Sequence, residues 1–260
     1  MTAPSRDALR EHLLRTRIAG QVGTPRTSNI GNIRKMLAHD PDYWFGVELT
    51  RDWSLEAVVA VMAERVGMDP DPTRETGSDV VDPDRCLDAL DDAADRLSTL
   101  TKTGGTALLA TGHPTGLLAM FMTVARTLAR RGVDVITPSA ESWVSVNDVH
   151  RRIRYVGSVA TIGTGGDLLH THSPEPMQLI LAGLHRRQEK LPDLVIADHG
   201  WAGAAGQAGL PTVGFADTND PALFVAQTEG KVGTVIPLDD NIAPADYEPV
   251  TAYLLSKISD

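Results

Sequence analysis

Four short apolar runs in the second half of this chain each end in a polar loop that leads into a helical pattern. The runs cover residues 106–110, 194–197, 212–216 and 234–238. Short apolar strands that alternate with helical segments are typical of an α/β protein with parallel strands. We therefore predict a Rossmann-like, doubly wound and mostly parallel sheet, whose helices cover both faces.

The first hundred residues predict helices instead of strands. Ser54 is a suitable cap for one of these helices, and Pro83 stands at the first position of another, where proline is tolerated. We place a helical N-terminal part at residues 1–102, packed on an α/β core at residues 103–260. Helices are expected at 8–18, 29–38, 55–66, 83–100, 117–130, 174–187, 201–208, 221–227 and 245–257, and further strands at 134–137 and 152–162, the last broken at Gly157.

Charge and composition limit the partners of this chain. The net charge is −10 and the pI is about 5.2, which argues against non-specific binding to nucleic acid or to an anionic membrane. No apolar run approaches the roughly 20 residues of a membrane helix, and the charged first 17 residues do not form a secretory signal. We expect a cytoplasmic protein that binds a small phosphorylated metabolite. Whether it forms a homo-oligomer is left open.

The polar loops that follow the four apolar runs are the strongest functional signal. They cover residues 111–116, 198–200, 217–220 and 239–241. Because the carboxyl ends of parallel strands face one crevice, residues from these four loops should converge there. Histidines, carboxylates and a glycine-containing turn in one cleft suit a phosphorylated ligand, with or without a metal.

The turn at residues 111–116 predicts a phosphate site. Helix N-termini offer free amides, so Gly112 and Gly116 could hold a phosphate and Thr115 could add a hydroxyl donor. His113 could donate to a phosphate oxygen or protonate a leaving group. The turn matches neither a Walker A loop nor the G-x-G-x-x-G fingerprint. The alternative is a tight turn with a surface histidine.

Asp198 and His199 end the most apolar run. A carboxylate and an imidazole at this position can bind a metal or act as an acid–base pair. The alternative is that Asp198 caps the next helix. We interpret both residues as catalytic, and Asp198 also as a metal ligand.

Asp217, Asp239 and Asp240 stand where two other runs end. Carboxylate oxygens suit Mg²⁺ or Mn²⁺, so we predict that these three residues are metal ligands. The alternative is a polar loop. Asp220 precedes Pro221, which is typical of a helix start, and we interpret Asp220 as an N-cap.

His170 and His172 lie two positions apart and would share one face of a strand. They could bind a metal or, with the glycines before them, form a second phosphate-binding edge; the alternative is a structured loop. The aromatic residues 43–45 predict packing, with lining of a substrate pocket as the alternative. Arginines that could meet a phosphate are Arg26, Arg34, Arg51 and Arg154.

Several motifs carry a resemblance to a known family. They are ATGHPTGLL (110–118), RRIRYVG (151–157), HTHSPEPM (170–177), ADHGWAGAAGQAG (197–209), GFADTNDPALF (214–224) and PLDDNIAP (237–244), with RTRIAG (15–20) and YWFG (43–46) near the N-terminus. Together they resemble an actinobacterial family of proteins described as phosphatases, along nearly the whole chain. The resemblance implies a hydrolase and brings no established catalytic residues.

These observations predict metal-assisted hydrolysis of a small phosphomonoester. The turn at 111–116 and the histidines at 170 and 172 would hold the phosphate, the aspartates would hold Mg²⁺ or Mn²⁺, and His113 or His199 would act as general acid or base. One alternative is a non-catalytic nucleotide or sugar-phosphate binding protein. Another is a phosphosugar isomerase or lyase. The nucleophile motif G-x-S-x-G is absent from the sequence.

Overall fold

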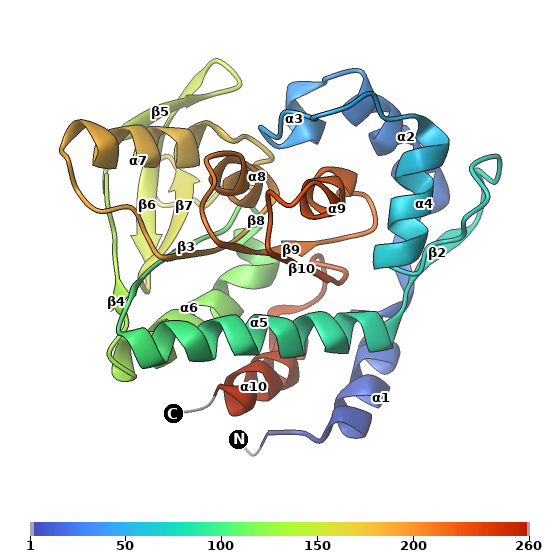
Figure 1. Ribbon diagram of the computed structural model, residues 1–260, viewed down its shortest axis with the longest axis horizontal. Coiled ribbons are helices and arrows are strands. Elements are labelled where there is room, and N and C mark those ends of the chain that lie inside the picture. The colour runs from blue at the N-terminus through green and yellow to red at the C-terminus, as the bar shows by residue number, and fades with distance from the viewer. Residues whose placement is uncertain (1–2, 259–260) are drawn as a thin grey trace.

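A computed structural model describes residues 3–258 as a mixed α/β sheet with helices on both faces (Figure 1). Its strand order is β10-β9-β8-β3-β7-β6-β5, and β4 pairs with the start of β3. The strands are β3 (Thr106–Ala110), β4 (Asp134–Val135), β5 (Trp143–Val146), β6 (Val149–Val156), β7 (Val159–Gly163), β8 (Leu194–Asp198), β9 (Thr212–Ala216) and β10 (Thr234–Pro237). Strands β10, β9, β8, β3 and β7 run parallel, whereas β6 is antiparallel to both of its neighbours. The predicted α/β fold with a mostly parallel sheet is confirmed.

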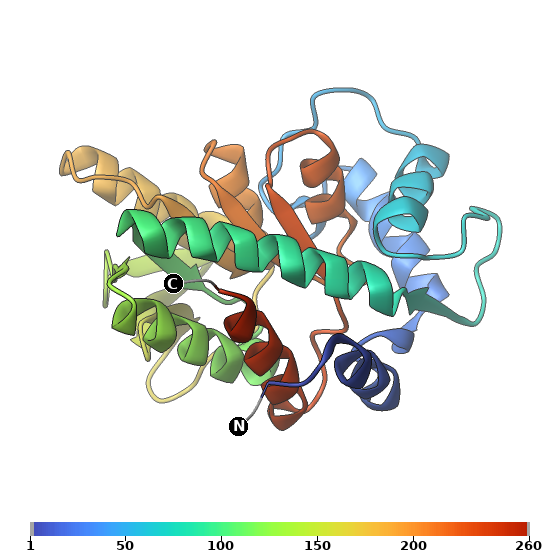
Figure 2. The same cartoon turned by 60° about the horizontal axis from the view of Figure 1, so that its bottom comes forward.

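Helices cover both faces of the sheet, as Figures 1 and 2 show. Every residue of β8 and β9 is buried, which is typical of parallel strands with helices on each side. One layer contains α7 (Glu175–Arg186), α8 (His199–Gln207) and α9 (Pro221–Thr228). The other contains α5 (Pro83–Thr103), α6 (Pro114–Arg130) and α10 (Glu248–Lys257), which follows the 3₁₀ turn η1 (Pro244–Tyr247).

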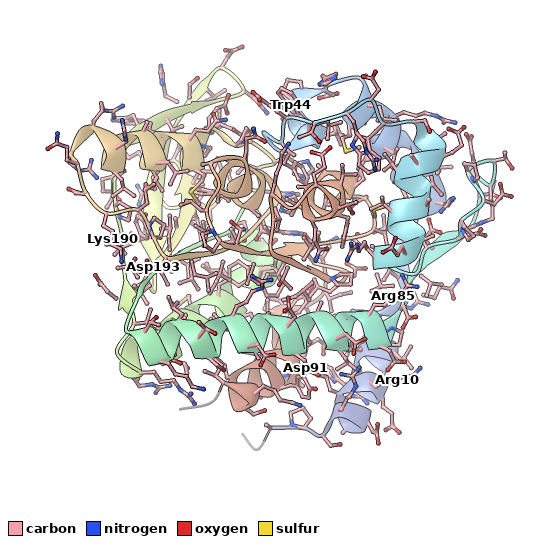
Figure 3. All side chains as sticks on the ribbon, viewed as in Figure 1. Arg10, Trp44, Arg85, Asp91, Lys190 and Asp193 are labelled. Carbon is pink, nitrogen blue, oxygen red and sulfur yellow. The ribbon has the colours of Figure 1, made fainter. Side chains whose placement is uncertain are left out.

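Helix α5 connects the N-terminal part to the core. Its apolar side packs on β10, and Asp91, labelled in Figure 3, forms an ion pair with Arg6 of α1 (Arg6–Thr16). Arg10 of α1, also labelled, pairs with Asp84 of α5. Among residues 3–258, neither α5 nor any other helix combines the length and the apolar character that crossing a bilayer requires.

The N-terminal part is helical, as predicted, and lies beside the β9–β10 edge of the sheet (Figure 1). Helices α2 (Arg26–Leu37) and α4 (Leu55–Arg65) contact α9, and α3 (Pro41–Trp44) lies near α8. The sequence did not predict the antiparallel pair β1 (Gly20–Pro25) and β2 (Ser78–Val81), because the glycines and proline of β1 are poor strand formers. A boundary at residues 102–103 stays a prediction.

Two hairpins form the other edge of the sheet. Gly157 and Ser158 both have positive φ and form the two-residue turn between β6 and β7, so the predicted break at Gly157 is confirmed. Asn147 and Asp148 make a similar turn between β5 and β6. Strand β5 was not predicted, and its Trp143 is exposed on this edge.

The strand order reverses between β3 and β8, and ligands of open α/β sheets bind at such a point. Asp193, labelled with Lys190 in Figure 3, fixes the register of these two strands. Its Oδ2 accepts hydrogen bonds from the Thr106 amide (2.8 Å) and hydroxyl (3.0 Å) and from Lys190 Nζ (2.8 Å). In this register Ala110 pairs with Ala197, so the loops after β3 and β8 begin side by side.

Candidate active site

The site gathers four histidines and five aspartates at the carboxyl ends of β3, β8, β9 and β10 and in the loop after β7. All are buried except His172, which is half-buried, and His170, which is exposed. The loops therefore converge as the parallel sheet predicts. The residues are His113, His170, His172, His199, Asp198, Asp217, Asp220, Asp239 and Asp240.

The four histidine rings are stacked in pairs. His113 lies on His170 with ring centroids 4.5 Å apart, and His172 lies on His199 at 4.7 Å. His170 lies 5.2 Å from His199, so the pairs are in contact. The loop that carries His170 and His172 is irregular, which confirms the alternative of a structured loop and corrects the idea that the two share a strand face. Both histidines lie in the same cleft as Asp198, because their rings contact the His199 ring and His199 donates a hydrogen bond to Asp198.

Burial and the nearby histidines favour neutral rings at the exposed end of this stack. They lower the pKa of His170 to about 4 and that of His172 to about 3. The Nδ1–H of His172 donates to the backbone oxygen of Asp42 at 2.9 Å, which leaves Nε2 as an acceptor. The aromatic residues Tyr43 and Phe45 meet His172 edge-on, so they contribute to the site as well as to packing.

His199 occupies a strained position between β8 and α8. Its φ is +45°, and the ring is held by Nδ1, which donates to Asp198 Oδ1 at 2.8 Å. The other nitrogen, Nε2, lies 3.7 Å from Asp220 Oδ2 and 3.6 Å from Asp240 Oδ2. Burial disfavours the charged imidazole, but the three surrounding carboxylates outweigh it and raise the pKa of His199 to about 10.

Asp198 connects the β3 loop to His199. Its Oδ2 accepts a hydrogen bond from the Thr111 hydroxyl (2.5 Å), and its Oδ1 accepts from the Gly112 amide (2.6 Å) and from His199. Asp198 stands at the N-cap position of α8, as the alternative held, but its side chain makes no cap bond to that helix. Both oxygens are engaged in orienting other groups. A role as metal ligand stays a prediction.

The glycines of the 111–116 turn allow loops to approach each other closely. A Cβ on Gly112 would lie 2.3 Å from the backbone oxygen of Thr171, and a Cβ on Gly116 would lie 2.1 Å from the backbone oxygen of Asp240. The Gly112 amide already donates to Asp198, and the Gly116 amide donates to the His113 oxygen at 3.2 Å. Thr115 is exposed. These contacts give the glycines a packing role, and phosphate binding by this turn stays a prediction.

Asp217 and Asp239 form the carboxylate end of the site. Asp217 Oδ2 accepts from the Thr24 hydroxyl at 2.5 Å, and Asp239 Oδ2 accepts from the Gly23 amide at 3.3 Å. Burial and the neighbouring carboxylates raise the pKa of both acids, that of Asp217 strongly. Thr24 and Gly23 belong to β1, so the unpredicted N-terminal strand holds two site residues in place.

Asp220 stands at the N-cap position of α9, as predicted, but its side chain lies in the candidate site. Its side chain makes no cap bond to α9; its Oδ2 accepts from the Asp217 amide at 3.2 Å and faces His199. Burial raises its pKa to about 6, with the charge of His199 opposing the shift. The neighbouring acids in the 217–220 loop were the signal that could have placed it in the site.

Three overlapping groups of side chains in this cluster could hold a metal ion. Within each group the donor atoms lie within 4.8 Å of one another. His199 belongs to two of the groups, and Asp240 belongs to two. The groups are His113–His170–His199, His199–Asp220–Asp240 and Asp217–Asp239–Asp240.

Two buried atoms of the cluster indicate that these donors fit a cation. Asp240 Oδ2 and His113 Nδ1 have no hydrogen-bond partner within the described part of the chain, although Nδ1 lies 3.2 Å from Asp240 Oδ1. Buried polar atoms without a partner are uncommon in proteins. Carboxylate and imidazole donors of this kind suit divalent cations.

A cavity of about 400 Å³ opens at the histidine end. Its wall includes His170 and His172, Tyr43 from α3, and Arg151 from β6. This volume lies within the range of small-molecule sites. Arg151 was not among the predicted arginines, because nothing in the β6 sequence shows which of its arginines faces the cavity.

Comparisons with known proteins give the family. A family model described as Phosphatase matches residues 4–260. Phosphatase SCO2771 from Streptomyces coelicolor is 45% identical over 256 residues, which cover 98% of this chain and 96% of that protein. The chain belongs to the Phosphatase family. The resemblance drawn from the sequence motifs is thereby confirmed.

The matched region of the Phosphatase family includes the N-terminal helical part, not only the sheet. This agrees with the structure, in which Gly23 and Thr24 of β1 hold site carboxylates and the Asp42 backbone orients His172. The site therefore depends on both parts of the chain. No short motif at these three positions would have indicated it.

Proposed function

We propose that this protein hydrolyses a small phosphomonoester with the help of a divalent cation. Membership of the Phosphatase family supports the reaction class. The observation that carries the proposal is the buried histidine–aspartate cluster beside a cavity of small-molecule size, in which Asp240 Oδ2 and His113 Nδ1 lack a hydrogen bond among the described residues.

The cation would be Mn²⁺ or Mg²⁺, held by the carboxylates and imidazoles of the cluster. Carboxylate oxygens suit both ions, and imidazole nitrogens favour Mn²⁺ over Mg²⁺. When bound, such an ion neutralises charge on the phosphoryl group and lowers the pKa of water. A nitrogen that binds a cation cannot carry a proton, so we assign His113 and His199 to holding the ion rather than to acid–base catalysis.

Asp198 would be a positioning residue. It engages Thr111, Gly112 and His199 and lies fully buried, so it acts on the reaction through the orientation of His199. Carboxylates that orient a ligating histidine in this way raise its basicity and fix its tautomer.

The cavity would hold the organic part of the substrate, and Arg151 would bind the phosphate. A guanidinium can donate two parallel hydrogen bonds to phosphate oxygens. Arg151 and His170 both line the cavity, which brings a cationic group and the histidine end of the cluster to the same space. His172 Nε2 and Tyr43 would contact the remainder of the substrate.

The test is phosphate release from a panel of phosphomonoesters, with Mn²⁺ or Mg²⁺ and again with chelator. We expect release that chelator abolishes and that Asp240→Asn loses. Release that persists in chelator would remove the cation from the proposal. No release from any compound, by protein shown to be folded, would favour the non-catalytic binding protein.

Two adjacent arginines of β6 provide a matched test of the cavity. Arg151 lines it, whereas Arg152 lies over the Trp143 ring and pairs with Glu141. Loss of a charged hydrogen bond costs about 1.5–3 kcal/mol, so Arg151→Ala should raise KM by roughly 10- to 100-fold. Arg152→Ala should leave KM unchanged. Equal effects of the two substitutions would place the substrate elsewhere.

A further inference from the structure

We propose that the site holds two divalent cations, one at each end of the cluster, with Asp240 between them. One would lie among the imidazoles of His113, His170 and His199, and the other among the carboxylates of Asp217, Asp239 and Asp240. The role of the ions in hydrolysis rests on the proposed function; their binding does not.

The first argument is the size of the donor groups. Donors around one ion, at about 2.0–2.2 Å from it, lie at most about 4.4 Å apart. The donor atoms of each group lie within 4.8 Å of one another, so small side-chain movements would bring them to this spacing. No group combines His170 with Asp217 or Asp239. One ion therefore cannot use both ends of the cluster.

The second argument is the position of Asp240. Its Oδ1 lies 3.2 Å from His113 Nδ1 at the histidine end, while the same residue belongs to the carboxylate group with Asp217 and Asp239. Asp240 is 6% exposed, and its Oδ2 has no hydrogen-bond partner among residues 3–258. A carboxylate has two oxygens and about four lone-pair sites, so Asp240 can bind the ion at the carboxylate end while its Oδ1 stays beside His113.

The third argument is charge. Five aspartates are buried together, and the ion pairs that they form are with His113 and His199. Buried charges are normally paired or bind metals. The five carboxylates outnumber the two histidines with which they pair, so bound divalent cations would offset charge that the protein groups do not.

The donor types give each ion a chemical class. Imidazole nitrogens suit Mn²⁺, Fe²⁺, Co²⁺ or Zn²⁺, and a carboxylate set suits Mg²⁺ or Mn²⁺. Mn²⁺ is therefore a probe that both ends should accept. In two-metal sites with ions about 3.5–4 Å apart, the pair binds the attacking and the leaving oxygen together.

The test is the stoichiometry of Mn²⁺ in chelator-treated, reloaded protein, measured by elemental analysis, with electron paramagnetic resonance to detect coupled ions. We expect two ions per wild-type chain and a coupled spectrum. His170→Ala and Asp239→Asn should each retain one uncoupled ion. His150→Ala, which changes an exposed histidine of β6, should retain two.

One ion or none in the folded wild type would overturn the proposal, and so would loss of the same ion in both site variants. His170 is exposed, so its replacement should not disturb folding. If Asp239→Asn does not fold, the number of Mn²⁺ ions per wild-type chain still decides between one ion and two. Phosphate release with one bound ion would refute the pair and leave the proposed function standing. Two bound ions without phosphate release would support the ion pair and refute the proposed function.

Discussion

Two clusters of buried charge lie close together in this protein, and they differ in how the charge is satisfied. In the first, Arg26 and Asp79 are both fully buried, and Arg26 Nη1 donates to the two Asp79 oxygens at 3.0 and 3.1 Å. Asn29 and Arg74 donate to the same carboxylate. In the second, the aspartates of the candidate site face histidines and one another, and Asp240 Oδ2 has no hydrogen-bond partner within the described range, although His199 Nε2 lies 3.6 Å away. Hydrogen bonds from protein groups satisfy the buried charge of the first cluster. In the second cluster, the described protein groups leave Asp240 Oδ2 without a hydrogen bond.

The comparison shows that burial of an acid does not by itself indicate function. Asn29 connects the clusters, since it donates to Asp79 and accepts from the Thr218 hydroxyl next to Asp217. The Arg26–Asp79 pair therefore supports the loop that carries a site carboxylate. The first cluster is structural, and we infer that it holds the second in position.

The largest effect should come from breaking the structural pair. Asp79→Asn leaves the buried Arg26 charge uncompensated, so it should lower the free energy of unfolding by about 3–5 kcal/mol. Urea unfolding in chelator measures this. Asp95→Asn, an exposed change on α5, should stay within about 0.5 kcal/mol of wild type. A loss below about 1 kcal/mol for Asp79→Asn would contradict the structural role.

In the second cluster, Asp198→Asn should reduce turnover while the protein stays folded. It removes the acceptor that orients His199, and substitutions behind a ligating histidine typically cost 10–100-fold in activity or metal affinity. Steady-state rates at saturating Mn²⁺, with circular dichroism as the folding control, measure this. Full activity in the variant would show that Asp198 does not position the site.

An Asp→Asn substitution at Asp217 should stabilise the metal-free protein, whereas Asp79→Asn should destabilise it. Burial and nearby carboxylates raise the pKa of Asp217, so its ionised form destabilises the metal-free protein. Asp217→Asn should therefore raise the free energy of unfolding of the chelated protein. Denaturant unfolding of Asp217→Asn and Asp79→Asn in parallel tests this. If both substitutions lower the free energy of unfolding, the two clusters do not differ in the way that we infer.

The stability of the chelated protein should also depend on pH. His199 keeps its proton up to a pKa of about 10 when folded, whereas an unfolded histidine loses it near 6.5. The folded state then binds more protons between these values, so stability should fall as pH rises from about 7 to about 9.5. Mn²⁺ affinity should rise over the same range, because His199 must lose its proton to bind. Melting curves that are equally flat in wild type and His199→Gln would refute this.

The strands of the sheet could be predicted because their signal is local. Residues 106–110 and 212–216 are apolar runs between turn residues, and they form β3 and β9 with the predicted bounds. Strand β1 could not be predicted, since its glycines and proline form a strand only by pairing with β2.

The sequence predicts those site residues that stand at the ends of parallel strands, because the topology brings these ends together. Asp217, Asp239 and Asp240 were placed by that rule alone. Asp before Pro predicted the N-cap position of Asp220 correctly, but only the tertiary contact with His199 shows that its side chain belongs to the site. Arg151 was missed because alternation along β6 does not reveal which face meets a ligand.

The central claim is that the histidine–aspartate cluster is completed by a cation. The most direct measurement is the melting temperature of chelated wild type as Mn²⁺ is added, compared with Asp240→Asn. At about 100-fold excess over Kd, binding adds about 2.7 kcal/mol, which should raise the wild-type Tm by about 5–10 °C and leave the variant nearly unchanged. A folded wild type whose Tm does not respond to Mn²⁺, Mg²⁺ or Zn²⁺ would contradict the claim.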